Sequence, residues 1–297
     1  MTDINQDHLY AKVSARIRAD FLETHRDGFS FYDIISFFNW KETETKKAVS
    51  KWLHYESTKA DPLLEKRNKY YIYIYKYLEP LDWTNVDLKP LELRWPRGID
   101  DGTAFGFEKN VFISPGSVNI IAGVSNTGKT AFLMNFIIEN MDKYSCLYMS
   151  NEFSAYGLKR RLRGFDWVDL IDGEGKPKFT AIKRYENWHH MLLADINVID
   201  YMRLDDNTQV EGAIKLIQEH LGNKIAFIAL QKPPGRDVGY GGQPTLNAAS
   251  FYLAMEKGKL KVIKVKDKEG NMYDGKTYSF GLGHYGAKFF DIQEGRE

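Results

Sequence analysis

The segment from Gly123 to Thr130 constrains this chain more than any other part of the sequence. Its letters, GVSNTGKT, fit the pattern G-x-x-x-x-G-K-[ST], in which glycines let backbone N–H groups turn toward phosphate oxygens. Residues 117–122 before it read as a buried strand, and residues 131–138 after it read as an apolar helix. A helix that starts at such a turn directs its positive end at the same anion. The segment therefore predicts a nucleoside triphosphate site rather than an ordinary strand–turn–helix.

Two side chains of this loop have chemistry of their own. A lysine at the position of Lys129 reaches the β- and γ-phosphates, and a hydroxyl at the position of Thr130 ligates Mg²⁺. The expected cofactors are therefore ATP and Mg²⁺. The residues assigned to the nucleotide are Gly123, Val124, Ser125, Asn126, Thr127, Gly128, Lys129, Thr130 and Ala131.

Composition excludes several classes of protein. The 297 residues are 43% hydrophobic and carry a net charge of +1, so a buried core is expected and any nucleic-acid site must be a local patch. Cys146 is the only cysteine, which forbids a disulfide within the chain. The polar start is no secretory signal, and no apolar run approaches the roughly 20 residues of a membrane span. We expect a cytoplasmic protein.

Three regions follow one another along the chain. Residues 98–297 alternate strand and helix signals, as in an α/β domain with a central, mostly parallel sheet. Residues 81–97 contain prolines and little periodicity, which indicates a linker. Residues 1–80 predict helices over 8–24, 29–38 and 43–55, then strand-like segments at 62–66 and 70–75 around a turn. Three helices and a hairpin are the pattern of a winged helix-turn-helix domain.

Carboxylates follow two strands downstream of the phosphate-binding loop. Glu152 ends the strand candidate 145–150, where a carboxylate is placed to orient an attacking water. The alternative is that Glu152 caps the next helix. Asp200 ends the apolar strand 196–199, which is the pattern of a Walker B residue that holds Mg²⁺. Because apolar strands that end in Asp are common, this pattern is weak by itself.

An uncharged amide ends a further strand. Gln231 follows the apolar run 225–230, where it is suited to contact a γ-phosphate or a water, or else simply caps the strand. The glycine-rich loop 232–242 comes next, with Lys232 and Arg236 as candidate contacts to single-stranded nucleic acid. The alternative is a mobile surface loop with two incidental charges.

The order of these motifs resembles the RecA-like ATPase core, and within it the hexameric replicative helicases of the DnaB type. Ser150-Asn151-Glu152 matches the Ser-x-Glu of that group, and Asp200-Tyr201 matches its Asp-Tyr, whereas its Ser-Gln is represented only by Leu230-Gln231. The resemblance implies ATP hydrolysis in a ring or filament, with loop 232–242 lining a channel for single-stranded DNA. It covers roughly residues 98–290.

The resemblance also implies basic residues that reach a neighbouring subunit's nucleotide. Lys266 and Lys268 occupy the place of a Lys-x-Arg-x-Gly element, with lysine where arginine is usual. A lysine cannot form the bidentate fork of an arginine with phosphate. A second departure is the winged-helix candidate, because helicases of this type carry a different N-terminal domain.

The N-terminal region contains a modest basic excess over residues 41–77. Lys46, Lys47, Lys51 and Arg67 are the candidate contacts to duplex DNA, and the alternative is a protein-binding module whose lysines are solvated. The tyrosines at 70–77 predict alternating strand packing rather than a platform for bases.

These observations predict an ATP-hydrolysing, DNA-binding motor, a helicase or translocase of DNA replication or recombination, in a phage or mobile element. Lys129, Glu152, Gln231, Lys266 and Lys268 are its expected catalytic residues, and Thr130 and Asp200 its Mg²⁺ ligands. The alternative is a regulator, loader or recombination mediator in which ATP sets assembly on DNA without translocation, and a protein remodeller is a third possibility.

Overall fold

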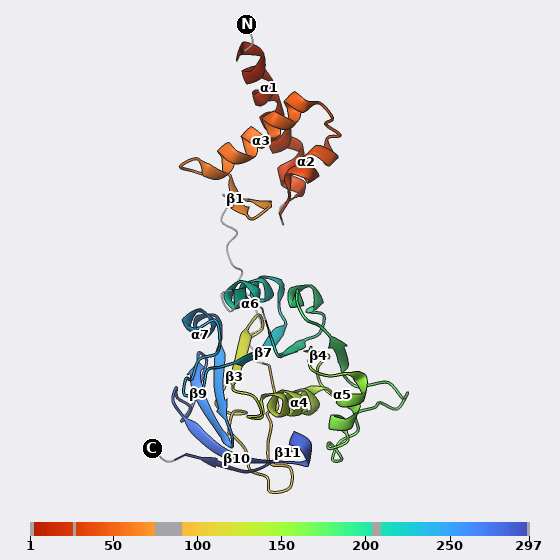
Figure 1. Cartoon of the computed structure of the whole chain (residues 1–297), viewed down its shortest axis with the longest axis vertical. Helices are drawn as coiled ribbons and strands as arrows, with labels where there is room; N and C mark the ends of the chain where they lie inside the picture. The colour runs from red at the N-terminus through yellow and green to blue at the C-terminus, as the bar shows by residue number, and fades with distance from the viewer. Residues whose placement is uncertain (1–2, 26–27, 75–90, 204–208, 296–297) are drawn as a thin grey trace. The chain divides into compact units, whose positions relative to one another are not determined.

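The computed structural model describes residues 3–25, 28–74, 91–203 and 209–295. The chain forms two compact units, Met1–Asp87 and Leu88–Glu297 (Figure 1). Each unit has its own hydrophobic core.

The first unit consists of three helices followed by a hairpin. Helix α1 (Asp3–Arg16) continues through a π-helical turn, η1 (Ile17–Phe21), and a 3₁₀ turn, η2 (Leu22–Thr24). Helices α2 (Phe31–Phe37) and α3 (Thr43–Thr58) follow, and β1 (Leu64–Arg67) pairs with β2 (Tyr70–Tyr73) in antiparallel register. This order suits a winged helix, but that classification stays a prediction.

Helix ends in this unit have local causes. Ser30 caps α2 through a capping box with Asp33, in which each side chain bonds to the other residue's backbone N–H. The sequence predicts one helix over residues 8–24, whereas the structure ends α1 at Arg16 and continues with irregular turns that keep Ile17 and Phe21 fully buried. The predicted strand residue Tyr75 and the basic Lys76 lie outside the described residues.

A buried carboxylate joins the helices of this unit. The side chain of Glu56 is only 2% exposed, and its two oxygens lie 2.6 Å from Arg18 Nη2 and 2.6 Å from Lys59 Nζ. A buried charge is tolerated when it is paired in this way. The pairing connects the end of α3 to the helical segment after α1.

The second unit is built on a nine-stranded sheet in the order β11-β10-β9-β8-β3-β7-β6-β4-β5. Strands β3 to β8 are parallel to one another, and β9 to β11 extend the sheet beyond β8 in antiparallel fashion. The strands are β3 (Val118–Gly123), β4 (Cys146–Ser150), β5 (Thr180–Lys183), β6 (Ile196–Asp200), β7 (Ile225–Gln231), β8 (Phe251–Glu256), β9 (Lys259–Val265), β10 (Thr277–Gly283) and β11 (Lys288–Glu294). The predicted α/β class with a mostly parallel sheet is confirmed.

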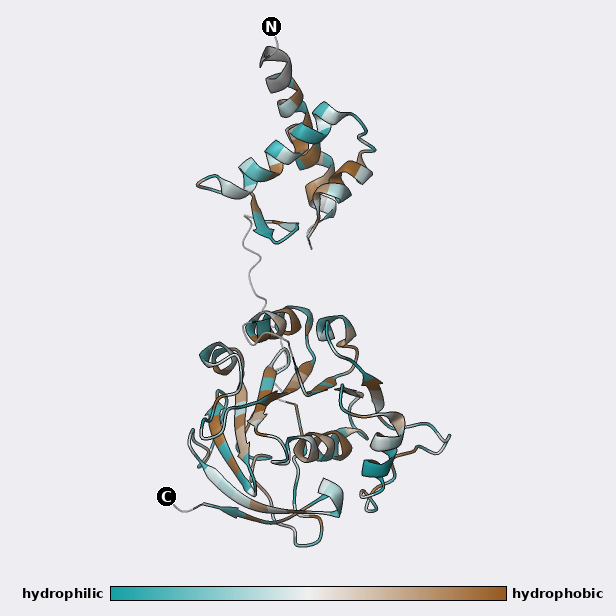
Figure 2. Ribbon diagram, in the orientation of Figure 1, coloured by the Kyte–Doolittle hydropathy of each residue, from teal (hydrophilic) through white to brown (hydrophobic). Residues whose placement is uncertain are grey.

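Helices cover both faces of this sheet. Helix α4 (Lys129–Asn140) packs in one core, while α6 (Gln209–His220) and α7 (Gln243–Ala248) contribute to the other. Helix α5 (Ala155–Leu162) follows β4, and short 3₁₀ turns form at η3 (Trp188–Met191) and η4 (His284–Gly286). Hydropathy follows this layering, since α4 and the central strands are brown in Figure 2. A continuously apolar strand is typical of a sheet that is covered on both faces.

The predicted linker is in part a piece of the second core. Within the segment 91–97, Leu93 and Trp95 are buried, and Trp95 is only 1% exposed. Its ring contacts Phe107, Phe136, Phe227 and Phe251 at centroid distances of 5.2 to 5.9 Å. The segment between the prolines at 90 and 96 is therefore fixed to the core and is not a free linker. Burial of the Trp95 indole fixes it, although its sequence shows no helix or strand periodicity. Residues 75–90 lie outside the described part of the chain.

Within the described ranges, no helix has both the length and the apolar character that crossing a bilayer requires.

Replacing Trp95 with alanine tests this anchor. Because large-to-small changes in a packed core lose both burial and contacts, Trp95→Ala is expected to lower the free energy of unfolding by about 3–5 kcal/mol. Urea denaturation followed by circular dichroism measures the change. Leu193→Ala is the control, since that side chain is 72% exposed. A Trp95→Ala chain as stable as this control would place residues 91–97 outside the core.

Candidate functional site

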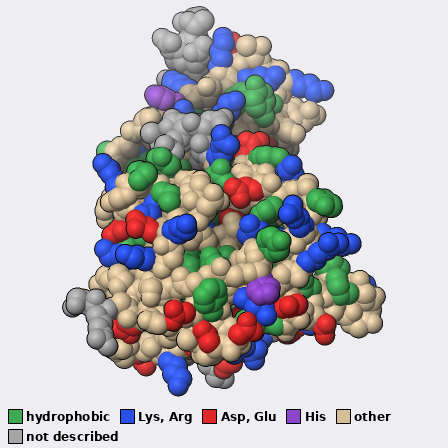
Figure 3. Space-filling view, turned by 60° about the horizontal axis from the view of Figure 1, so that its bottom comes forward, with side chains coloured by type: hydrophobic (Ala, Val, Ile, Leu, Met, Phe, Trp, Pro, Cys, Tyr) green, Lys and Arg blue, Asp and Glu red, His purple; other side chains and the backbone are tan. Residues whose placement is uncertain are grey.

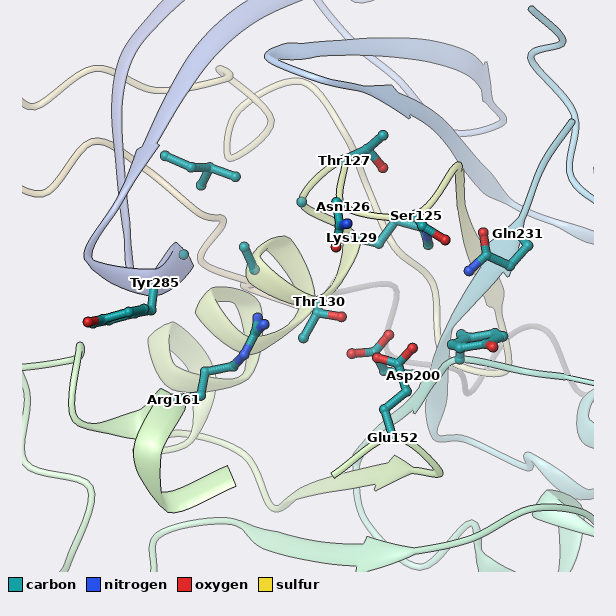
Figure 4. A pocket seen from close by; sticks show the side chains of 15 residues that line it. Ser125, Asn126, Thr127, Lys129, Thr130, Glu152, Arg161, Asp200, Gln231 and Tyr285 are labelled. Carbon is teal, nitrogen blue, oxygen red and sulfur yellow. The ribbon is translucent and has the colours of Figure 1, made fainter. Parts of the chain in front are cut away.

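The site lies where the parallel strands end (Figure 4). In the register of the sheet, Gly123 on β3 pairs with Gln231 on β7, and Ser150 on β4 pairs with Asp200 on β6. Because these four strands run in the same direction, the residues after them meet at one edge. A cavity of about 400 Å³ opens there, lined by the predicted nucleotide-binding residues 125–131 and by Glu152, Asp200 and Gln231.

The phosphate-binding loop has the backbone that its glycines predict. Gly128 adopts a φ of 104° as the residue before α4, in the left-handed region that favours glycine. A Cβ on Gly128 would lie 2.8 Å from Leu282 Cδ1 on β10. A side chain at position 128 would therefore be strained by the backbone conformation and would require Leu282 to shift, and the N-terminus of α4 faces the cavity.

Lys129 is buried and held by the loop itself. It is 6% exposed, and its Nζ donates to the carbonyl oxygens of Gly123 and Val124, each at 2.8 Å. Burial lowers the pKa of the Lys129 ammonium, and the carboxylates of Asp200 and Glu152 oppose this shift. The cation is thus placed next to the two carboxylates predicted for the site.

Asp200 is fixed by a partner that the sequence analysis missed. Tyr148 on β4 donates a hydrogen bond from its hydroxyl to Asp200 Oδ2 at 2.6 Å, and both residues are 1% exposed. Burial raises the pKa of the Asp200 carboxyl, while hydrogen bonds from Tyr148 and Thr130 lower it. Alternation along β4 does not distinguish a tyrosine that packs from one that bonds, so no sequence signal marks Tyr148.

The oxygens of Thr130 and Asp200 suit a hard cation. The Thr130 hydroxyl and the Asp200 carboxylate both line the cavity, and the hydrogen bond between them shows that they converge. Mg²⁺ prefers one or two protein oxygens together with substrate phosphates and water. The donor set therefore fits Mg²⁺. Among the described residues, no three His, Cys, Asp or Glu side chains gather as a self-contained metal site.

Glu152 stands at the rim of the cavity, with an exposed side chain. Partial burial raises the pKa of its carboxyl, and the charge of Asp200 adds to that shift. The alternative role as a helix cap is wrong, because Ser154 is the N-cap of α5 and its Oγ accepts from the backbone N–H of Gly157 at 3.2 Å. Glu152 therefore does not cap helix α5.

Further side chains line the cavity without having been predicted as site residues, Arg161, Tyr201, Leu282 and Tyr285 among them. Arg161 projects from α5 toward Thr130, and Leu282 and Tyr285 come from β10 and the η4 turn (Figure 4). Tyr285 is 76% exposed, so its ring offers a free face at the cavity. A guanidinium in the same cavity as Lys129 suits phosphate, whereas an apolar side chain and an aromatic ring suit a nucleobase. The helical spacing of Leu158, Arg161 and Leu162 was a signal that Arg161 faces inward.

Lys232 is not the exposed nucleic-acid contact that the sequence predicts. Its side chain is 0% exposed, and its Nζ bonds to Glu256 Oε1 at 3.0 Å and to the carbonyl of Arg236 at 2.6 Å. The lysine turns inward toward Glu256, which ends the parallel strand β8 on the other side of β3 and attracts its charge. Arg236 remains exposed, as predicted for a contact residue.

Lys266 and Lys268 lie at the opposite edge of the sheet from the phosphate-binding loop. Strand β9 is antiparallel to β8, and Val265 at its end pairs with Phe251 at the start of β8. Both lysines are exposed, and Lys268 Nζ lies 3.1 Å from Asp274 Oδ1. They do not contact the nucleotide cavity of their own chain, so a role at a nucleotide requires a second subunit.

The four DNA-binding candidates of the first unit are partly engaged within it. Lys47 Nζ lies 2.9 Å from Glu44 Oε1, and Lys51 Nζ lies 5.5 Å from the centroid of the Tyr10 ring. Arg67 pairs with Glu65 at 3.0 Å, and Lys46 is half-buried. Exposed pairs of this kind are weak, so they do not prevent a phosphate from displacing the acidic partner.

The strand order, the phosphate-binding loop and the carboxylates at neighbouring strand ends define a P-loop ATPase domain with a RecA-like fold. Residues 102–224 match the family model described as "ATPase: KaiC". A solved KaiC-like protein from the archaeon Pyrococcus horikoshii OT3 superposes with a TM-score of 0.50 at 17% identity, over 68% of this chain and 99% of that one. No curated protein matches the sequence significantly. The second unit is therefore similar to KaiC-type ATPases, and the narrower DnaB-type resemblance stays a prediction.

The two basic residues of loop 232–242 are expected to respond differently to mutation. Lys232→Ala removes the buried donor to the Arg236 carbonyl and to Glu256, so the free energy of unfolding is expected to fall by about 1–3 kcal/mol. Arg236→Ala changes an exposed side chain and is expected to leave stability within about 0.5 kcal/mol. Urea titration of both variants measures this difference, and equal stabilities would contradict the structural role of Lys232.

Proposed function

We propose that the second unit hydrolyses ATP at the cavity around Gly123–Thr130. The observation that carries this proposal is the convergence of Lys129, Asp200, Glu152 and Gln231, from separate strand ends, on one cavity with the phosphate-binding loop. The match to KaiC-type ATPases supports it. In this proposal the backbone N–H groups of the loop and the Lys129 ammonium bind the β- and γ-phosphates.

Glu152 is the proposed base for the attacking water. Its raised pKa makes it a better proton acceptor than an ordinary carboxylate. Lys129 and Arg161 neutralise the charge that develops on the transferred phosphoryl group. Gln231, which pairs with Gly123 across β3 and β7, hydrogen-bonds the γ-phosphate or the water.

Thr130 and Asp200 are the residues that would hold Mg²⁺. When bound, the ion neutralises phosphate charge and orients the β- and γ-phosphates. Tyr148 keeps the Asp200 carboxylate oriented toward Thr130, so it acts as a positioning residue.

We propose that hydrolysis drives movement on DNA in a homo-oligomer, as in a helicase or translocase. The placement of Lys266 and Lys268 away from their own cavity supports an assembly in which they approach a neighbour's nucleotide. A head-to-tail contact of this kind generates a hexameric ring or a filament. The modest basic excess over residues 41–77 supports a contact of the first unit to duplex DNA.

A second candidate function is an ATP-dependent switch. In a regulator, loader or recombination mediator, ATP sets assembly on DNA and no translocation follows. The order of three helices and a hairpin in the first unit favours this candidate, because winged-helix domains commonly bind duplex DNA.

The assignment of the ATPase site predicts two distinct losses. Lys129→Ala is expected to abolish nucleotide binding, since it removes the buried cation of the loop. Glu152→Gln is expected to keep ATP binding within a few-fold and to lower kcat by about 10²-fold or more, since it removes the base. Fluorescent nucleotide titration and phosphate release measure the two effects. Full turnover in either variant would sink the proposed roles.

A strand-displacement assay separates the motor from the switch. The motor predicts ATP-dependent unwinding of a forked duplex by the wild-type chain and none by Glu152→Gln. The switch predicts ATP hydrolysis and ATP-dependent DNA binding without displacement on any substrate. Native mass spectrometry with a non-hydrolysable ATP analogue reports the subunit number in the same samples, and a strictly monomeric chain that unwinds DNA would contradict the shared-site arrangement.

A further inference from the structure

Helix α5 has two faces with different chemistry. Its inner face carries Leu158 and Leu162, which pack against the core, and Arg161, which lines the nucleotide cavity. Its outer face carries Tyr156, Lys159, Arg160 and Arg163, all exposed. Positions three and four apart lie on one side of a helix, so these four side chains form a single surface, which we call the α5 outer face.

The cations of this face have no partners of their own. Within the described residues, the side chains of Lys159, Arg160 and Arg163 form no hydrogen bond and no ion pair, whereas lysines such as Lys261, Lys276 and Lys288 pair with a carboxylate. Tyr156 precedes them by one turn and is 78% exposed. Figure 3 shows basic and hydrophobic side chains standing next to one another on the surface toward the right of the view. Like charges on one helical turn repel, and an anion removes that repulsion.

Helix α5 is also connected to the nucleotide cavity, through Arg161 and through the segments at its two ends. It begins three residues after Glu152, and the Arg161 guanidinium lies 5.1 Å from the ring centroid of Phe153, the residue that follows Glu152. Arg161 itself lines the cavity. Beyond the helix, a Cβ on Gly164 would lie 2.4 Å from the carbonyl oxygen of His284, so only glycine allows this close approach to the turn that carries Tyr285.

We propose that the α5 outer face binds a single strand of nucleic acid and transmits its presence to the ATPase site. This inference rests on the proposed nucleic-acid-dependent ATPase, and it moves the strand contact from the inward-turned Lys232 to α5. Lys159, Arg160 and Arg163 contact successive phosphates, and the Tyr156 ring stacks on a base, the combination by which single strands are held without sequence preference. When the strand binds, a shift of α5 moves Arg161 relative to the γ-phosphate, because Arg161 and the α5 outer face belong to the same short helix.

The test uses the full chain with labelled oligo-dT, measured by fluorescence anisotropy and by stimulation of ATP hydrolysis. Arg160→Glu/Arg163→Glu is expected to weaken oligo-dT binding at least tenfold and to abolish stimulation, with basal turnover within twofold of wild type. Because each lost phosphate contact on a single strand lowers the slope of log K against log salt by about 0.7, the slope should fall by about 1.4. A variant that merely unfolds would lose basal turnover as well.

Two further variants keep the test sharp. Tyr156→Ala is expected to weaken binding and Tyr156→Phe to preserve it, since phenylalanine retains the stacking face. Lys109→Glu/Lys215→Glu makes the same change in net charge at exposed lysines off α5 and is expected to bind like wild type.

The outcomes are distinguishable. Wild-type binding that survives Arg160→Glu/Arg163→Glu, or that falls equally in the Lys109/Lys215 control, overturns the α5 site and leaves the proposed function standing. A wild-type chain that hydrolyses ATP but binds no oligo-dT at low salt overturns both the α5 site and the nucleic-acid part of the proposed function.

Discussion

The parallel register of β4, β6, β7 and β3 is the constraint on which the rest of the site depends. It places Ser150 beside Asp200 and Gly123 beside Gln231, so that residues up to about a hundred positions apart meet at one edge. The hydrogen bond from Tyr148 to Asp200 then orients a fully buried carboxylate that burial alone would favour in its neutral form. The positions of Asp200 and Gln231 are thus set by paired strands, which form a rigid frame around the phosphate-binding loop.

Helix α5 is the element that connects this frame to the surface. It starts next to Glu152, presents Arg161 to the cavity, and ends against the turn that carries Tyr285. A short helix that adjoins the proposed catalytic site and exposes unpaired cations on its other face is a natural place for an external ligand to act. The same logic explains why the buried Lys232 is a poorer candidate, since its charge is already satisfied by Glu256.

Local patterns were enough to predict the α/β class, the phosphate-binding loop and the carboxylates at the strand ends. Each of these depends on residues close together in the sequence, such as an apolar run followed by Asp200. Trp95, Lys232 and Tyr148 were misread or missed for the opposite reason. Whether an indole between two prolines packs in a core, or a lysine in a glycine-rich loop turns inward, depends on partners as distant as Phe251 and Glu256.

The sequence by itself determined that this protein carries a phosphate-binding loop between a buried strand and a helix, because the glycines, Lys129 and Thr130 act through local backbone geometry. Only the tertiary structure decided which other side chains share that cavity and which do not. Tertiary structure brought Arg161, Leu282 and Tyr285 into the cavity and gave α5 an inner and an outer face. It placed Lys266 and Lys268 at the edge of the sheet opposite the phosphate-binding loop. The physical reason is that strand order and helix packing, which set these distances, are properties of the whole domain and not of any segment.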